Sequence, residues 1–339
     1  MSKLSSCVGA ILVTALISGA SGTAVAETNI KIATLAPKGS PWMVVLDKAA
    51  AEIAEKTSNR VTLKYFEGGQ QGDERDAVRK VEGGQIDGAA VTSIGLSMID
   101  ESIRVLELPR MFATAEEVDY VADRMWPYFQ QKFDKKGWKL NDRGEVGWIH
   151  FIAKEPIATM ADIKKIPIWQ WGDDKIVKTM FAKLGLKGVP LGVPEVDPSL
   201  TSGRIKAAYG SPVAAVALQW YSKVKYMSSM PMSFGIGATV VRTKTLEKLS
   251  AEDRKTVEEI GKSAAKKLRK TIRKSNEEAK TTMMRKGVQL VETSAEVVKA
   301  FDDAAKSVWD ELAAAGVYTK AELAMVIKYR DEYRAKTKK

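Results

Sequence analysis

The sequence predicts an α/β protein of two lobes, with a long helix that spans both of them. Three observations support this fold class. A rhythm of short apolar strands and amphipathic helices occurs twice, around residues 30–110 and 146–240. The 339 residues are too many for one small core. The pattern beyond Thr245 is almost entirely helical, and its first helix, expected over Leu246–Arg285, is long for a globular domain.

The sequence shows no convincing internal repeat, and the first occurrence of the rhythm has three strands with helices between and after them. The strands are expected at Ile30–Leu35, Val61–Phe66 and Ile86–Val91, and the helices at Trp42–Thr57, Asp73–Glu82 and Thr114–Lys136. This order favours a mostly parallel sheet with helices on both of its faces.

The second occurrence of the rhythm is richer in strands. They are expected at Val146–Ala153, Ile166–Trp171, Ile205–Tyr209, Met227–Phe234 and Ala238–Arg242, with helices at Lys175–Leu184 and Val196–Ser202. Two more helices, Ala295–Ala315 and Lys320–Thr337, are expected near the C-terminus. Because ligands of such folds bind at the carboxyl ends of strands, the cleft between the lobes is the expected binding site.

The first 26 residues have the pattern of a secretory signal peptide. Lys3 is their only charge, Val8–Ala20 is an apolar run, and Ala24–Ala26 is a small-x-small cleavage site. The run is too short to span a bilayer comfortably. We therefore expect cleavage after Ala26 and a periplasmic protein. The remaining chain is expected to form lobe I from 27–152 plus 236–275, and lobe II from 153–235 plus 276–339.

Charge and cysteine content exclude several functions. The formal net charge is +11, and loss of Lys3 with the signal peptide leaves +10. Because the protein is exported, this charge does not indicate a nucleic-acid partner. It is concentrated in 262–286, either as the solvated face of a long helix or as a docking face for an acidic partner. Cys7 is the only cysteine, so the mature chain has no disulfide, thiol nucleophile or thiolate metal site.

Catalytic motifs are missing as well. The sequence contains no G-x-S-x-G, P-loop or H-E-x-x-H motif. The only histidine, His150, lies in an apolar strand and is either a catalytic base or a satisfied interior or hinge residue. The adjacent pairs Asp173-Asp174 and Asp302-Asp303 do not face each other, which favours caps and surface positions. We expect neither an enzyme, nor a metal site, nor a cofactor.

The segment Ile163–Asp174 has the most distinctive pattern of the chain. As a strand, it places Pro167, Trp169 and Trp171 on one side. Two tryptophans at this spacing are either core residues or the wall of a binding site, and the pattern alone does not decide between them.

Three motifs earlier in the chain carry a family resemblance. They are Gly69–Arg75 (GQQGDER), Gly84–Asp87 (GQID) and Leu108–Phe112 (LPRMF). Their order and spacing resemble those of the solute-binding receptors of tripartite ATP-independent periplasmic (TRAP) transporters, of the dicarboxylate-receptor type. The resemblance covers essentially the whole mature chain. It implies a two-lobe, periplasmic-binding-protein-like fold that closes on a ligand and delivers it to membrane permease subunits.

The chain departs from this family at the positions that bind the ligand. By resemblance, Trp169 stands where typical members have a ligand-binding arginine, Ile149 where they have a second one, and Ser211 where they have an asparagine. An unpaired buried carboxylate is costly, so a small dicarboxylate is not the expected ligand. We expect an apolar or aromatic ligand, with a quaternary ammonium as a second option.

The expected cleft has an aromatic wall and a few polar points. Its candidate binding residues are Trp148, Ile149, Trp169, Trp171, Val193 and Tyr209, with Thr92, Ser93, Gln170 and Ser211 as the polar points. In the alternative interpretation, the bulky side chains fill the pocket, and the protein binds a periplasmic protein partner instead of a small ligand.

Overall fold

A computed structural model describes residues 27–337 as a mixed α/β protein, and the signal-peptide prediction for residues 1–26 lies outside the described residues. Ten strands of this part of the chain form one hydrogen-bonded sheet. Eight of them follow the path β2-β1-β3-β9-β5-β8-β6-β7, and β4 and β10 each pair with β9. The strands are β1 (Thr28–Thr34), β2 (Val61–Phe66), β3 (Gly88–Thr92), β4 (Trp138–Leu140), β5 (Gly144–Ala153), β6 (Pro167–Trp171), β7 (Lys187–Leu191), β8 (Ala207–Gly210), β9 (Tyr226–Arg242) and β10 (Gln289–Val291).

The helices flank this sheet. They are α1 (Pro41–Lys56), α2 (Glu74–Glu82), α3 (Ser93–Ile99), α4 (Ala115–Lys135), α5 (Met160–Lys165), α6 (Lys175–Leu184), α7 (Val196–Ser202), α8 (Pro212–Ala217), α9 (Thr243–Leu246), α10 (Ala251–Arg285), α11 (Ala295–Ala314) and α12 (Lys320–Thr337). Short 3₁₀ helices occur at η1 (Glu101–Glu107), η2 (Val193–Glu195) and η3 (Trp220–Lys223). Within residues 27–337, none of the helices has the length and apolar character needed to cross a bilayer.

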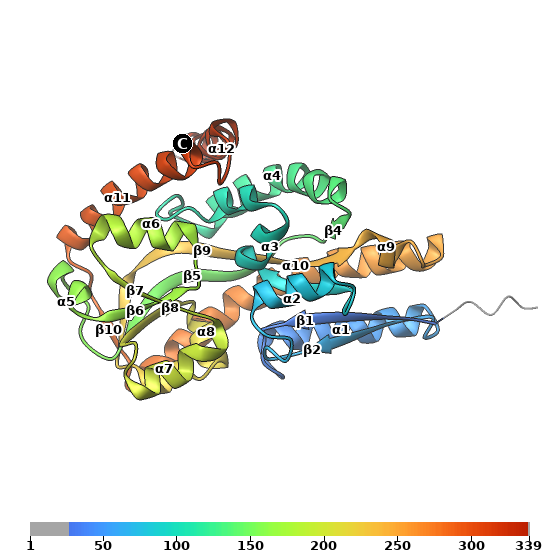
Figure 1. Ribbon diagram of the computed structural model, residues 1–339, viewed down its shortest axis with the longest axis horizontal. Helices are drawn as coiled ribbons and strands as arrows, with labels where there is room; N and C mark the ends of the chain where they lie inside the picture. Colours follow the sequence, from blue (N-terminus) through green and yellow to red (C-terminus); the bar gives the residue numbers. More distant parts are fainter. Residues whose placement is uncertain (1–26, 338–339) are drawn as a thin grey trace, which may run out of the picture.

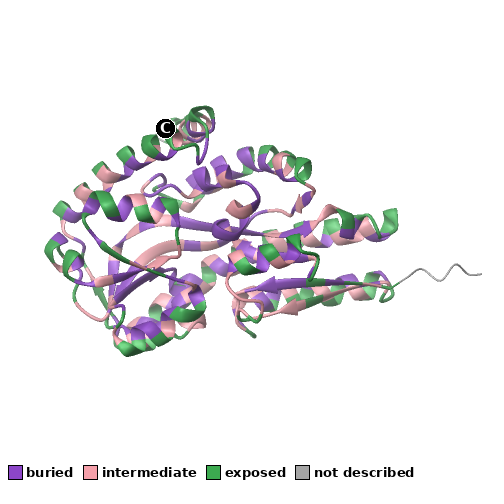
Figure 2. Cartoon of the chain, viewed as in Figure 1, coloured by how far each residue is buried: buried purple, intermediate pink, exposed green. Residues whose placement is uncertain are grey.

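Two lobes share this sheet. Lobe I contains β1–β3 with α1–α4, and lobe II contains β6–β8 with α5–α8 (Figure 1). The long strands β5 and β9 run between the lobes and pair with each other in antiparallel register. Figure 2 shows that buried residues are concentrated along β9 and on the inner faces of the helices. The predicted two-lobe α/β fold is confirmed, while the residue boundaries of the lobes stay a prediction.

The long helix α10 joins the two lobes. It packs against α1 of lobe I and against α8 of lobe II. Its N-terminus is fixed by Ser250, whose hydroxyl accepts a hydrogen bond from the Asp253 N–H at 3.0 Å. The helix therefore starts at Ala251, five residues later than predicted, because Ser250 separates it from the short helix α9.

The sheet is mixed rather than mostly parallel. Strand β1 pairs in parallel with β2 and β3, and β6 pairs in parallel with β7 and β8. Strand β9 is antiparallel to both β3 and β5. The parallel arrangement predicted from the βαβ rhythm thus holds within each lobe, and the strands that connect the lobes run antiparallel.

Candidate ligand-binding cleft

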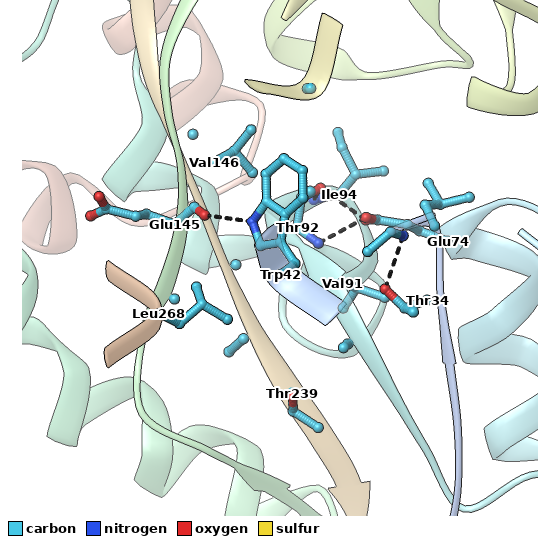
Figure 3. A pocket seen from close by; sticks show the side chains of 18 of the residues that line it. Thr34, Trp42, Glu74, Val91, Thr92, Ile94, Glu145, Val146, Thr239 and Leu268 are labelled. Carbon is cyan, nitrogen blue, oxygen red and sulfur yellow. Dashed lines mark hydrogen bonds between the residues drawn. The ribbon is translucent and has the colours of Figure 1, made fainter. Parts of the chain in front are cut away.

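A cavity of about 310 Å³ begins between the lobes and is lined from both sides. Lobe I contributes Thr34, Trp42 and Thr92, and lobe II contributes Trp171 and Tyr209. Its volume lies at the lower end of the range of small-molecule sites. Figure 3 shows Trp42 among the side chains that line it. The cavity lies where the sequence places the cleft.

The lobe II wall is a cluster of aromatic rings centred on Trp169. Its ring stacks on Tyr209 with 4.7 Å between centroids and lies 5.5 Å from Trp171. Trp220 packs edge-on against it at 5.3 Å. The Trp169 indole N–H donates to the Leu191 carbonyl at 2.9 Å, and the residue is 2% exposed. Trp169 is therefore anchored as part of the wall, and it shares a side of β6 with Trp171, as predicted.

Trp171 connects the wall to the opposite lobe. Its indole N–H donates to the Asp73 carboxylate, at the N-terminus of α2, over 2.8 Å. Its main-chain N–H donates to the Tyr209 hydroxyl at 3.0 Å. Beside it, Arg75 of α2 pairs with Asp173 at 3.3 Å. These contacts hold the lobes together, so the cleft is closed in this conformation.

Trp42 forms the lobe I side of the cavity. It follows Pro41 in the first turn of α1, where the Ser40 hydroxyl accepts a hydrogen bond from the Met43 N–H at 3.4 Å. Its indole N–H donates to the main-chain carbonyl of Glu145 at 3.1 Å (Figure 3). The helix cap and this bond fix the orientation of the Trp42 ring.

One arginine lines the cavity, and its charge is already matched. Arg104 of η1 is buried, and its Nη2 lies 3.0 and 2.8 Å from the two carboxylate oxygens of Asp174 in lobe II. Its Nη1 donates to the Ser93 hydroxyl and to Glu107, the latter at 3.2 Å. Burial opposes the charge of Arg104, but the carboxylates of Asp174 and Glu107 outweigh burial and raise its pKa.

The carboxylates of Glu107 and Glu74, which also belong to this part of the cleft, have hydrogen-bond partners as well. Burial raises the pKa of Glu107, whose carboxylate accepts hydrogen bonds from the Ser93 hydroxyl and the Ile236 N–H. Burial also raises the pKa of Glu74 to about 7, although the carboxylate accepts three hydrogen bonds of 2.8 Å from Thr92 and Gly95. With one cation against Asp174 and Glu107, this part of the cleft has no surplus positive charge.

Six of the ten predicted binding residues line the cavity. These are Thr92, Ile149, Trp169, Trp171, Val193 and Tyr209. The other four are not among the lining residues. Trp148 packs edge-on against Phe234 at 5.0 Å, and Ser93 binds Arg104 and Glu107. The Gln170 amide donates to the Gly172 carbonyl at 2.7 Å, and Ser211 caps α8 by accepting a hydrogen bond from the Ala214 N–H.

Several lining residues were not predicted, among them Trp42, Glu74 and Arg104. Because Trp169 and Ile149 stand where typical members have arginines, the sequence predicts a cleft with no evident cation for a carboxylate, and Arg104 corrects that prediction. A signal for it was present, because Arg104 and Glu107 stand three residues apart as the only charges in Ser102–Pro109.

Metal chemistry has no support within residues 27–337. No group of three His, Cys, Asp or Glu side chains there could hold a metal ion. His150 does not line the cavity; its Nδ1 lies 2.9 Å from the Ser228 carbonyl, where the register of β5 and β9 shifts. Burial lowers the pKa of His150 to about 4, so the ring is neutral near pH 7.

Two lobes that close on a lined cavity, joined by long strands and a spanning helix, define a solute-binding receptor. The sequence matches the family of bacterial extracellular solute-binding proteins, family 7 (DctP), over residues 32–315. The chain therefore belongs to this family and is a periplasmic solute-binding receptor of the TRAP type. The predictions of the family and of a non-enzymatic function are confirmed.

Curated relatives cover most of the chain at low identity. The uncharacterized protein YiiZ of Salmonella typhimurium is 28% identical over 253 residues, which are 72% of this chain and 75% of that protein. A solute-binding protein of Chromohalobacter salexigens is 24% identical over 293 residues, with 86% and 87% covered. Receptors of this type deliver small ligands to membrane permease subunits.

Solved structures show the same fold. A TRAP periplasmic solute-binding protein of Xanthobacter autotrophicus with bound β-D-galacturonate superposes with a TM-score of 0.82 at 19% identity, covering 89% of this chain and 99% of that chain. The Bordetella pertussis receptor DctP7, which binds pyroglutamic acid, has a TM-score of 0.83 at 19% identity, covering 90% and 100%. At this identity, the likeness concerns the fold and not the ligand.

Proposed function

We propose that this receptor captures a neutral apolar or aromatic ligand rather than a small carboxylate. The observation that carries the proposal is the state of Arg104, whose guanidinium is held by Asp174, Glu107 and Ser93. The lobe II position that resembles the ligand arginine of typical members holds Trp169 instead. A carboxylate entering this cleft would have to displace Asp174 or remain unpaired, and both are costly.

Apolar contacts with the aromatic wall, rather than charge, attract the ligand. Burial of apolar surface stabilises a complex by about 25 cal/mol per Å². Stacked rings such as Trp169 and Tyr209 offer a flat apolar surface of this kind, and Trp42 offers another from lobe I. Thr92 is the polar point predicted from the sequence that lines the cavity. Such a site favours a neutral ring or chain with few polar groups.

We assign direct ligand contacts to the six predicted residues that line the cavity and to Trp42. Ser93, Trp148, Gln170 and Ser211 then act indirectly: Ser93 positions Arg104, Trp148 packs on Phe234, and Ser211 caps α8. A quaternary ammonium is the second ligand option, because the faces of aromatic rings such as Trp169 and Tyr209 attract cations. A ligand-free protein-interaction role has less support, since a cavity remains between the closed lobes.

The ligand can be identified directly from the protein. We would express the full chain in a Gram-negative host, purify it from periplasmic extract, and measure its mass under native conditions before and after denaturation. A neutral organic molecule released on denaturation supports the proposal. The matched control is Trp171→Ala, purified in the same way, which should carry less of it. A released uronate, dicarboxylate or other acid would overturn the proposal.

Location and delivery complete the proposed function. A signal peptide cleaved after Ala26 would place the mature receptor in the periplasm, with Glu27 as its first residue. N-terminal sequencing of the exported protein tests this, and a start at another residue contradicts it. We propose that the loaded receptor then docks on the membrane permease subunits of its transporter. The two lobes, with the boundaries predicted from the sequence, move relative to each other as a hinge.

A further inference from the structure

The cavity does not end at the cleft but continues into lobe I. Beyond Trp42, its lining passes to the face of the sheet that carries Ile32, Leu63, Tyr65 and Ala90. The opposite side is formed by the inner faces of α1 and α10, including Ala49 and Ala264. We call this part, between the β1–β3 face and helices α1 and α10, the lobe I chamber. Most of the residues that form its walls are apolar, and Thr239, Asn141 and Glu258 add polar groups.

The cavity is lined by members of two separate clusters of the apolar core. The cluster around Ile30, Ile53 and Val241 and the cluster around Leu268 and Ile272 are distinct from each other and from the main core. Protein interiors are normally close-packed, and an apolar cavity destabilises a fold in proportion to its volume. We therefore expect an apolar cavity between two helices and a sheet to have a function.

A glycine in the middle of α10 helps to keep the chamber open. Gly261 lines the cavity and has a helical backbone that does not require glycine. A Cβ atom added there would meet only the Asn141 Nδ2 at 3.6 Å, an ordinary contact. Because glycine is disfavoured inside helices, neither helix propensity nor the backbone conformation explains a glycine at position 261. Gly261 and Ala264 fill little space, so α10 carries no large side chain at these two positions of the cavity lining.

Trp42 stands between the cleft and the chamber. Its indole is fixed by the hydrogen bond to the Glu145 carbonyl and contacts the core cluster around Leu268 (Figure 3). All four of Val146, Ile94, Leu268 and Thr239 line the cavity, and in Figure 3 the first two lie beside the Trp42 ring and the last two below it. A flexible chain that passes the Trp42 ring would occupy both parts of the cavity at once.

We propose that the chamber binds the aliphatic tail of a ligand whose ring or neutral head lies against the aromatic wall of the cleft. The inference rests on the proposed function and narrows its ligand class to amphipathic or alkyl-substituted molecules. A cavity of about 310 Å³ is roughly twice the engineered apolar cavity of about 150 Å³ that binds benzene. Its volume thus suits one ring with an attached chain.

The test measures how affinity depends on chain length. Calorimetry would follow the binding of phenol, para-propylphenol and para-hexylphenol, which are neutral at pH 7, to the mature protein. We expect affinity to rise about fourfold for each added methylene, which corresponds to about 0.8 kcal/mol per buried group. In Gly261→Leu, phenol should bind as in the wild type, but the gain from the chain should be lost.

Two further variants keep the result interpretable. Gly261→Ala is the milder filling variant and should lower the affinity for para-hexylphenol alone. Ala182→Leu changes an exposed position of α6 and should leave the whole series unchanged. Phenol binding without a chain-length effect, or an effect that persists in Gly261→Leu, overturns the chamber and leaves the proposed function intact. Failure of every phenol to bind the wild type overturns both.

Discussion

Arg104 and Asp174 face each other across the closed cleft and form an ion pair, in which the single nitrogen Nη2 of Arg104 lies 2.8 and 3.0 Å from the two carboxylate oxygens. Arg104 belongs to η1 of lobe I, and Asp174 is the N-cap residue of α6 in lobe II. Both side chains are buried, so the pair is little screened. It closes the lobes on each other and, at the same time, uses the charge that a carboxylate ligand would need.

Replacing Asp174 by asparagine should release that charge. Asparagine can keep the cap on α6, where the carboxylate accepts the Ile176 N–H at 3.0 Å, but it leaves Arg104 without this partner. We expect urea unfolding to show a loss of about 3 kcal/mol. We also expect calorimetry to show binding of benzoate that the wild type lacks. The matched control, Asp173→Asn, removes an exposed carboxylate and should cost at most about 1 kcal/mol. Unchanged stability in Asp174→Asn would contradict the role given to the pair.

Trp171→Phe should weaken the closed state while it preserves an aromatic ring. The variant loses the hydrogen bond from the indole to Asp73 in lobe I. Hydrogen bonds to charged groups contribute about 1.5–3 kcal/mol, so ligand affinity should fall at least about tenfold. Small-angle scattering should show a larger radius for the ligand-free variant. Trp148→Phe, at a position that does not line the cavity, serves as the control. Equal effects of the two variants would refute the bridging role of Trp171.

His150 lies where the register of β5 and β9 shifts, and its protonation can be measured directly. Burial lowers its pKa to about 4, well below the ordinary value near 6.5, so the folded protein binds fewer protons than the unfolded chain between these values. Its contribution to stability is therefore fully present above pH 6.5 and is lost as the pH falls toward 4. Because it is the only histidine, one NMR titration reports it. A measured pKa of 6 or more would mean that the ring is not buried as described.

Glu74 should produce a pH dependence of the opposite sign. Burial raises its pKa to about 7, so the folded protein binds the extra proton between about pH 4.5 and 7, and stability falls as the pH rises through this window. Glu74→Gln cannot accept all three hydrogen bonds of the carboxylate and should be less stable at pH 5. Its deficit should shrink by roughly 1–3 kcal/mol by pH 8. Thermal unfolding at both pH values checks this, and a constant difference would exclude a raised pKa.

Much of the fold could be predicted from local signals. Helices α6 and α7 were predicted at their observed bounds, and Asp174 caps α6 as its place before that helix suggests. Strand β9 was predicted as two pieces because Gly235 and Gly237 interrupt its apolar pattern. In the structure, these glycines allow close approach instead: a Cβ atom at Gly237 would lie 2.7 Å from the Val91 carbonyl. A glycine in the sequence therefore does not distinguish a turn from a close contact between strands.

The site was less accessible to sequence reasoning. The alternation of Trp169 and Trp171 was sufficient to place both rings on one side of β6, where their centroids lie 5.5 Å apart. The pairing of Arg104 with Asp174 joins residues 70 positions apart in the chain, and no local spacing encodes it. The chamber behind Trp42 depends on how α10 crosses the sheet, which follows from packing rather than from pattern.

The central claim is that this cleft selects against carboxylates. Calorimetry on the mature protein, unfolded and refolded to release any bound ligand, tests it most directly by comparing para-propylphenol with succinate and D-glucuronate. We predict that the neutral phenol binds with a dissociation constant in the micromolar range, about −8 kcal/mol, while neither acid binds detectably at millimolar concentration. Micromolar binding of succinate or D-glucuronate to the wild type would contradict the account.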